Sequence, residues 1–135
     1  MKSPQEILSI MLQYDHFSEW MKLEVVALEK GSCTLSCVTK KDMLNGFAIL
    51  HGGITYSLSD SALAFASNSY GYKCVSIETS ISHLRPIGVD TKLIVHCYEI
   101  HRGKTIGIYG VDIHDAEGQL VSKFKGTVNI SKDAW

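Results

Sequence analysis

GGITYSLSDSALAFAS, residues 52–67, consists of apolar and small residues apart from one charged side chain, Asp60. This composition predicts a single helix that continues to about Ser69. No Lys or Arg in the run neutralises the carboxylate, and burying an unpaired carboxylate is costly or raises its pKa. A chain seldom carries that cost without a use for the group, so we interpret Asp60 as functional. The alternative is a partly exposed Asp bonded to the Ser57 or Ser61 hydroxyl.

The rest of the chain predicts one short helix and six strands. Ser3-Pro4-Gln5-Glu6 has capping-box spacing with Pro at the first helical position, which indicates an amphipathic helix at about residues 4–14. Alternating polar and apolar residues between turn signals predict the strands. These strands span residues 21–29, 32–40, 73–84, 91–101, 105–114 and 119–130.

This order of elements predicts the fold class. An antiparallel sheet of six strands has one face to cover, and the apolar helix is the only element able to cover it. Small residues at positions 57, 61, 62, 64 and 66 would let the sheet wrap closely around the helix. We therefore expect an α+β protein with the hotdog fold, a long antiparallel sheet around a central helix, in one domain of residues 1–135. Long edge strands also invite pairing with a second copy of the chain.

Composition narrows the classes of partner. The chain has 135 residues and a formal net charge of −1, and its Lys and Arg residues are scattered, so we expect no nucleic-acid partner. No apolar run approaches the ~18 residues of a membrane span, and the first residues lack a signal-peptide pattern. Cys33 and Cys37 would lie ~13 Å apart on one strand, too far for a disulfide. Reduced thiols and a cytoplasmic location are the expectation, with no metal site.

The loop before the helix, Asn45-Gly46-Phe47-Ala48-Ile49-Leu50-His51-Gly52-Gly53, predicts a site for a carbonyl oxygen. A helix start holds unpaired N–H groups and about half a unit of positive charge. Gly52 and Gly53 keep side chains away from it, which is the geometry of an oxyanion hole, although a simple tight turn explains the pair equally well. His51 can act as a base, but we favour a role in bonding to backbone and fixing the loop.

Three further positions are candidates for chemistry near the carboxylate. Asp60 can serve as general base or nucleophile towards a carbonyl. Asn45 can hold a water or the substrate carbonyl, with a turn residue as the alternative. Ser76, on a strand opposite the helix, can hold a water beside Asp60, and a satisfied strand serine is an equally good interpretation.

The spacing of the two main features predicts a shared site. Gly52 and Asp60 are eight residues apart, or ~12 Å along a helix axis. One thioester or ester carbonyl cannot touch both ends of that span. Two antiparallel helices related by a two-fold axis would pair the features twice, so we expect two sites per homodimer.

Two cations are candidates for contact with a phosphate-bearing ligand. Arg85 lies before Pro86 near the end of its strand, and Lys104 lies in the next hairpin turn. A solvated surface charge is the alternative for each.

The motifs around these residues resemble those of the hotdog-fold acyl-CoA thioesterases, specifically the phenylacetate-degradation (PaaI-type) group of the 4-hydroxybenzoyl-CoA thioesterase superfamily. The similarity runs from about Asn45 to the end of the chain. The matching segments are Asn45-Gly46-x-x-x-x-His51-Gly52-Gly53, Leu58-Ser59-Asp60-Ser61-Ala62, Ile81-x-x-Leu84-Arg85-Pro86, Gly103-Lys104-Thr105 and Gly126-Thr127. One departure is Ser59, where many members carry Ala; its hydroxyl can add a hydrogen bond to Asp60.

The resemblance implies hydrolysis of an acyl-CoA thioester to free acid and CoA, with no cofactor besides the substrate. Asp60 matches the catalytic carboxylate, and Gly52 matches the residue whose N–H polarises the thioester carbonyl. Asn45 matches a residue near the thioester and water, Ser76 a hydroxyl that positions the nucleophile, and His51 the loop-ordering histidine. Members of the family have sites between subunits and are commonly homotetramers built from dimers.

The acyl group is less well specified. Phe47, Tyr56, Phe65 and Leu84 can line an acyl pocket or belong to the core. Aryl-acetyl or hydroxylated aryl-acetyl CoA is the preferred class, and medium-chain acyl-CoA follows closely. The alternative function is a non-catalytic module that binds acyl-CoA; a hotdog dehydratase ranks lower because the carboxylate matches the thioesterase position.

Overall fold

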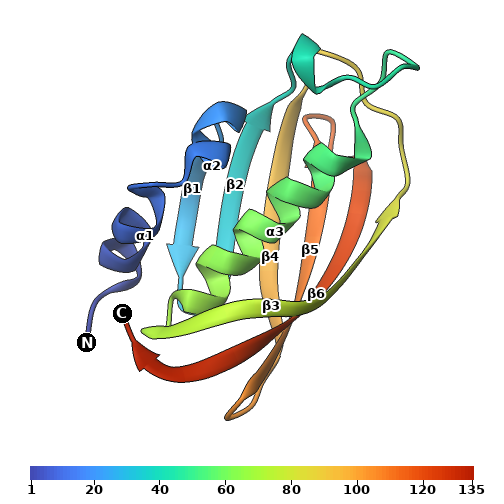
Figure 1. Ribbon diagram of the computed structural model, residues 1–135. Coiled ribbons are helices and arrows are strands. Elements are labelled where there is room, and N and C mark those ends of the chain that lie inside the picture. Colours follow the sequence, from blue (N-terminus) through green and yellow to red (C-terminus); the bar gives the residue numbers. More distant parts are fainter.

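The computed structural model describes all 135 residues, as helices packed on one curved sheet (Figure 1). The elements in chain order are α1 (Pro4–Leu12), α2 (His16–Met21), β1 (Glu24–Glu29), β2 (Ser32–Val38), the 3-10 turn η1 (Lys41–Met43), α3 (Gly52–Asn68), β3 (Tyr72–His83), β4 (Lys92–Arg102), β5 (Ile106–Asp115) and β6 (Leu120–Ala134).

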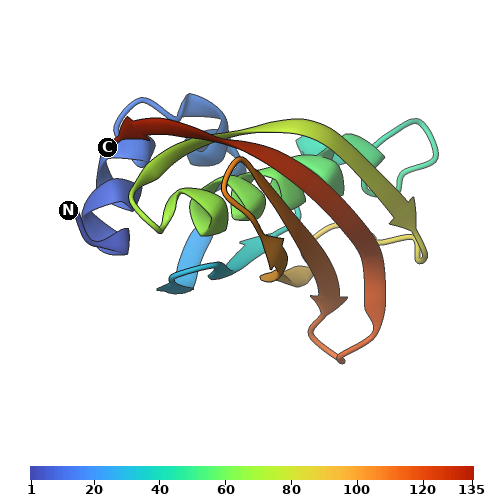
Figure 2. The same cartoon turned by 90° about the horizontal axis from the view of Figure 1, so that it is seen from below.

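The six strands form a single antiparallel sheet in the order β1-β2-β4-β5-β6-β3. The sheet curves around α3, which lies along its concave face (Figure 2). The predicted α+β hotdog architecture is therefore confirmed. β1 and β3 are the two edge strands.

The core lies between α3 and the sheet. Leu58, Ala62, Leu63 and Ala66 are almost completely buried on the helix side. Ala62 and Ala66 allow the close approach that the sequence predicts. Ser57, Ser61 and Ala64 were also expected to face the sheet, and this is wrong. They are only partly buried, because they lie with Asp60 on the helix face that the chain's own sheet leaves uncovered.

The N-terminal third departs most from the sequence-based prediction. Residues 16–21 form α2, which the sequence analysis did not predict, and β1 starts at Glu24 instead of residue 21. Asp15 caps this helix by accepting a hydrogen bond from Ser18 N–H at 3.0 Å. Lys22 ends the helix with a left-handed backbone at φ 53°. Other boundaries also move: the first helix ends at residue 12, and the last strand extends to residue 134.

A chain reversal after α3 places the end of β3 beside the start of α3. Gly71 makes the turn with φ 105°, a conformation that side chains disfavour. β3 then runs back along the helix, and the His83 ring at its end lies 3.2 Å from the Thr55 hydroxyl. The four cysteines are buried and free, and none of the helices has the length and hydropathy that a membrane span requires.

The closest helix–sheet approach generates a stability prediction. A Cβ on Gly126 of β6 would lie 2.5 Å from Leu63 Cδ2, and the buried Leu63 side chain has little room to move. Gly126→Ala should therefore lower the free energy of unfolding by ~1–3 kcal/mol, measured by urea denaturation. Leu63→Ala should reduce the effect of adding this methyl group. Gly88→Ala, whose Cβ would have no atom within 4 Å, is the control.

If Gly126→Ala is no more destabilising than Gly88→Ala, then close packing between β6 and α3 does not restrict residue 126.

Candidate active site

The start of α3 presents one free backbone donor. His51 is the N-cap, and its Nδ1 accepts a hydrogen bond from Gly53 N–H at 2.8 Å. The predicted backbone-bonding role of His51 is thus confirmed. Because this cap occupies the Gly53 N–H, the glycine pair does not offer two donors to a ligand, as the sequence suggested. Gly52 N–H has no acceptor within the chain and remains available.

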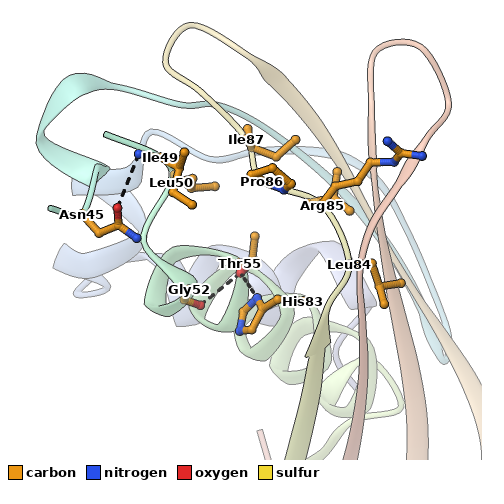
Figure 3. A pocket seen from close by; sticks show the side chains of 11 residues that line it. Asn45, Ile49, Leu50, Gly52, Thr55, His83, Leu84, Arg85, Pro86 and Ile87 are labelled. Carbon is orange, nitrogen blue, oxygen red and sulfur yellow. Dashed lines mark hydrogen bonds between the residues drawn. The ribbon is translucent and has the colours of Figure 1, made fainter. Parts of the chain in front are cut away.

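The loop before the helix is organised by Asn45. Its Oδ1 accepts hydrogen bonds from Phe47 N–H at 2.9 Å and Ile49 N–H at 3.4 Å, and its own N–H donates to the Ile49 carbonyl at 2.8 Å. The side-chain oxygen of Asn45 therefore stabilises the turn, as the alternative interpretation of this residue predicts. Its side-chain nitrogen has no partner and points towards the cavity beside Gly52 (Figure 3). Asn45 can thus hold the loop and still donate to a ligand.

A cavity of about 390 Å³ opens beside this helix start (Figure 3). It brings together three of the predicted residues, Asn45, Gly52 and Arg85. The remaining lining residues are Ile49, Leu50, Thr55, His83, Leu84, Pro86, Ile87 and Val121. Arg85 is the one charged side chain among them. The cavity therefore combines apolar walls with a free N–H, an amide donor and a cation.

Asp60 is half-buried on the uncovered face of α3 and has no bonding partner in the chain. The one ion pair of the structure joins Lys123 and Asp112, and no hydrogen bond reaches the Asp60 carboxylate. Burial raises the pKa of this carboxyl above its ordinary value. The interpretation of Asp60 as bonded to neighbouring serines is wrong for Ser57, whose hydroxyl donates to the Gly53 carbonyl at 2.7 Å.

The two serines adjacent to Asp60 do not bond to the carboxylate either. Ser59 is fully buried, and its hydroxyl donates to the Thr55 carbonyl at 2.8 Å. The expected extra hydrogen bond from Ser59 to Asp60 is therefore absent. Ser61 is half-buried and forms no hydrogen bond with Asp60. The carboxylate is left free to meet a ligand or a second subunit.

Ser76 lies near Asp60, as the sequence suggested. The two residues line a cavity of about 230 Å³ between α3 and β3. The other lining residues are Leu63, Ala64, Ser67, Cys74, Val75 and Val128. Ser76 is exposed and its hydroxyl has no partner in the chain, so it can bind a water next to the carboxylate.

Within one chain, the helix start and the carboxylate belong to separate cavities. The cavity with Gly52 does not include Asp60, and the two cavities that Asp60 lines do not include Gly52 or Asn45. This separation agrees with the ~12 Å between the two positions along the helix. A single chain therefore does not bring both groups to one carbonyl.

Arg85 and Lys104 also lie apart. Arg85 N–H bonds to the Val121 carbonyl near the start of β6. Lys104 is in the turn between β4 and β5, where Ile106 pairs with Asn129 near the other end of β6. The structure does not bring the two cations together in one chain.

The candidate acyl-pocket residues have different positions. Leu84 is 53% exposed and lines the cavity beside Gly52. Phe65 is buried in the core, Tyr56 bonds to the Thr79 hydroxyl, and Phe47 is 87% exposed at the loop. Leu84 is therefore the one of the four that lines the Gly52 cavity.

Sequence reasoning missed two polar members of the Gly52 cavity, His83 and Thr55. The order of elements contained a signal for His83. When the chain reverses after a helix, the strand that follows runs back towards the start of that helix. The polar residue at the end of that strand then lies beside the exposed backbone donors.

Comparisons with known proteins identify the family of the chain. The family model described as Thioesterase superfamily matches residues 47–122, more than half of the chain. A putative esterase of Archaeoglobus fulgidus is 30% identical over 92% of this chain and 80% of its own length. The acyl-coenzyme A thioesterase PaaI of Escherichia coli is 29% identical, over 86% of this chain and 83% of its own.

The solved structure of the E. coli PaaI protein, from the phenylacetic acid degradation operon, superimposes with a TM-score of 0.94 and 26% identity. The superposition covers 97% of this chain and 95% of that protein. The chain therefore belongs to the thioesterase superfamily, as a PaaI-type hotdog thioesterase.

Proposed function

We infer that this thioester hydrolase acts on an acyl-CoA and releases the free acid and CoA. The observation that carries the proposal is Asp60, a half-buried carboxylate without a partner on the uncovered face of the helix whose start leaves Gly52 N–H free. Acyl transfer to water needs a donor for the developing oxyanion and a base or nucleophile. These two groups supply both.

In the proposed mechanism, the thioester carbonyl oxygen accepts a hydrogen bond from Gly52 N–H. The positive end of the α3 dipole stabilises the negative charge that develops on that oxygen. On one route, Asp60 takes a proton from water, the water attacks the carbonyl carbon, and the carbon–sulfur bond breaks so that CoA leaves as the thiolate. On the other route, Asp60 attacks the carbonyl carbon itself and displaces the CoA thiolate, and water then hydrolyses the resulting mixed anhydride to release the free acid and regenerate Asp60. Asn45 holds the carbonyl or the water through its side-chain nitrogen, and Ser76 positions the nucleophile.

The site is proposed to lie between two subunits. Because Gly52 and Asp60 of one chain face different cavities, Asp60 of one protomer would meet the helix start of its partner. Two antiparallel α3 helices that pack through their uncovered faces satisfy this requirement twice. The β3 edge supports such pairing, since Val75 and Ile77 are 65% and 57% exposed on it. We propose a homodimer with two sites, which assembles further into a homotetramer.

The CoA phosphates are proposed to bind the two separated cations from different chains. Arg85 lines the cavity of Gly52 in its own protomer. Lys104 lies at the other end of β6, so it would reach the same ligand only from another protomer. His51 contributes by holding the loop through the Gly53 N–H.

Aryl-acetyl or medium-chain acyl groups are the proposed acyl class. The apolar lining of the Gly52 cavity, which includes Leu84, favours an apolar acyl group over a charged one. The E. coli relative comes from a phenylacetic acid degradation operon, which supports the aryl-acetyl class and a role in phenylacetate degradation. A cytoplasmic location is proposed as well.

Asp60→Asn should lower kcat by about two orders of magnitude or more, the scale of acid–base and nucleophilic roles. The assay is thiol release from acetyl-, decanoyl-, phenylacetyl- and hydroxyphenylacetyl-CoA. Asp112→Asn, which removes a carboxylate paired with Lys123 on the sheet, is the matched control and should retain activity.

Near-normal turnover by Asp60→Asn would remove Asp60 from the mechanism. If the wild-type protein binds acyl-CoA but hydrolyses none of the four substrates, the chain is instead a non-catalytic acyl-CoA-binding module.

Asp60→Asn should also stabilise the fold at neutral pH. Since burial raises the pKa of this carboxyl, the folded protein binds the proton more tightly than the unfolded chain, and stability falls as pH rises through the folded-state pKa. Asn removes this penalty, so its Tm should exceed that of the wild type at pH 7.5. The gain should shrink as pH is lowered towards 3.8, the ordinary value. A lower Tm at pH 7.5 would show that the carboxylate stabilises the fold.

Mixing two inactive variants should restore activity if the site is shared. Gly52→Pro removes the proposed donor at a helix position whose backbone tolerates proline. Gly52→Ala also places a Cβ 3.0 Å from His83 Nε2 but keeps the N–H, so it is the control for the added side chain. A hybrid of Asp60→Asn and Gly52→Pro protomers contains one intact site of two. Complete exchange at equal ratio makes half of the dimers hybrid, so about one quarter of wild-type activity should return. No gain, under exchange verified by mass spectrometry, would place each site within one chain.

A further inference from the structure

His83 is a polar residue of the Gly52 cavity to which the proposed mechanism gives no role. It is the last residue of β3, and its ring packs against the bare Cα of Gly52. A Cβ on residue 52 would lie 3.0 Å from His83 Nε2. The glycine at the helix start thus makes room for the imidazole as well as for a ligand.

The contacts of Thr55 determine which nitrogen of His83 carries the proton. The Thr55 hydroxyl lies 3.0 Å from the Gly52 carbonyl oxygen, which can only accept, so the single hydroxyl hydrogen is used there. The same hydroxyl oxygen lies 3.2 Å from His83 Nδ1 and must accept from it. Neutral His83 is therefore protonated on Nδ1, and Nε2 is left as a free acceptor beside Gly52, on a residue that lines the cavity.

The position of His83 in the cavity indicates what meets this acceptor. Gly52 offers a donor for the thioester carbonyl, Arg85 offers a charge for the phosphates, and His83 lines the same cavity with its ring next to Gly52. Figure 3 shows the His83 ring beside Gly52, while the Arg85 side chain extends away from it. In an acyl-CoA, two methylenes separate the thioester sulfur from an amide N–H, which is a donor. The amide N–H of the ligand would thus lie near His83 Nε2 when the thioester carbonyl is at Gly52 N–H.

We propose that His83 Nε2 accepts a hydrogen bond from the amide N–H next to the thioester and so selects substrates that carry a pantetheine arm. The inference rests on the proposed thioesterase function. In this proposal, His83 allows the site to distinguish a CoA thioester from a simple alkyl thioester. His83 is a specificity-determining residue in this proposal and takes no part in proton transfer.

The test compares two thioesters of one acyl group that differ in this amide. Phenylacetyl-N-acetylcysteamine contains the amide N–H, and S-butyl phenylthioacetate lacks it. His83→Phe keeps a ring against Gly52 but removes the acceptor. It should lower kcat/KM for the first substrate about five- to tenfold more than for the second, the size of one neutral hydrogen bond. His83→Gln, whose side-chain oxygen reaches a similar position, should recover most of the difference.

Equal losses on both thioesters would overturn the proposal, because His83 would then act on the reacting groups themselves. Thr55→Val adds an independent check: it removes the hydroxyl that fixes the proton on Nδ1, so it should reduce the same discrimination. Thermal unfolding of each variant verifies the fold.

A binding measurement keeps the proposal testable if the wild type shows no hydrolysis. Free CoA carries the same amide, so its Kd, from calorimetry, should rise several-fold in His83→Phe and much less in His83→Gln. An unchanged Kd in His83→Phe would overturn the proposal, whereas absent turnover with the expected change in Kd would overturn only the hydrolytic function.

Discussion

The packing of α3 into the concave face of the sheet is the interaction on which the rest of this molecule depends. The helix buries Leu58, Ala62, Leu63 and Ala66 against strands that have no other cover. Because these contacts fix its rotation, Asp60 is held on the opposite face, away from the chain's own sheet. The same packing directs the helix start towards the loop of Asn45 and the end of β3. One buried contact surface therefore sets the direction of both proposed reactive groups.

The sequence predicts the features that depend on local pattern and fails where distant segments meet. The run of residues 52–67 and the alternation of the later strands give the hotdog architecture, since one apolar helix must cover one sheet face. The unpaired state of Asp60 also follows, because no cation lies within the run. α2 was missed because six residues are too few to show a helical pattern, although Asp15 followed by Ser18 was an available capping signal.

Two aspects of the site depend on tertiary geometry that sequence spacing does not contain. Gly52 and Gly53 look equivalent in the sequence, yet the orientation of the His51 ring occupies one N–H and leaves the other free. Arg85 and Lys104 look like one phosphate-binding pair, yet strand register places them at opposite ends of β6. In both cases the sequence identified the right residue types. Their positions in the folded chain determined which backbone donor is free and which cations can meet one ligand.

β3 is an unpaired edge of the sheet and also contributes to the ligand cavity. Its last residue, His83, lines the cavity beside Gly52. A neighbouring strand that hydrogen-bonds to this edge would hold β3 straight along its length and reduce the motion of its final residue. If two chains pair along this edge, as proposed, the shape of the ligand cavity is coupled to self-association. For such an enzyme, specific activity would depend on protein concentration, and dilution would loosen substrate recognition before it unfolds the chain.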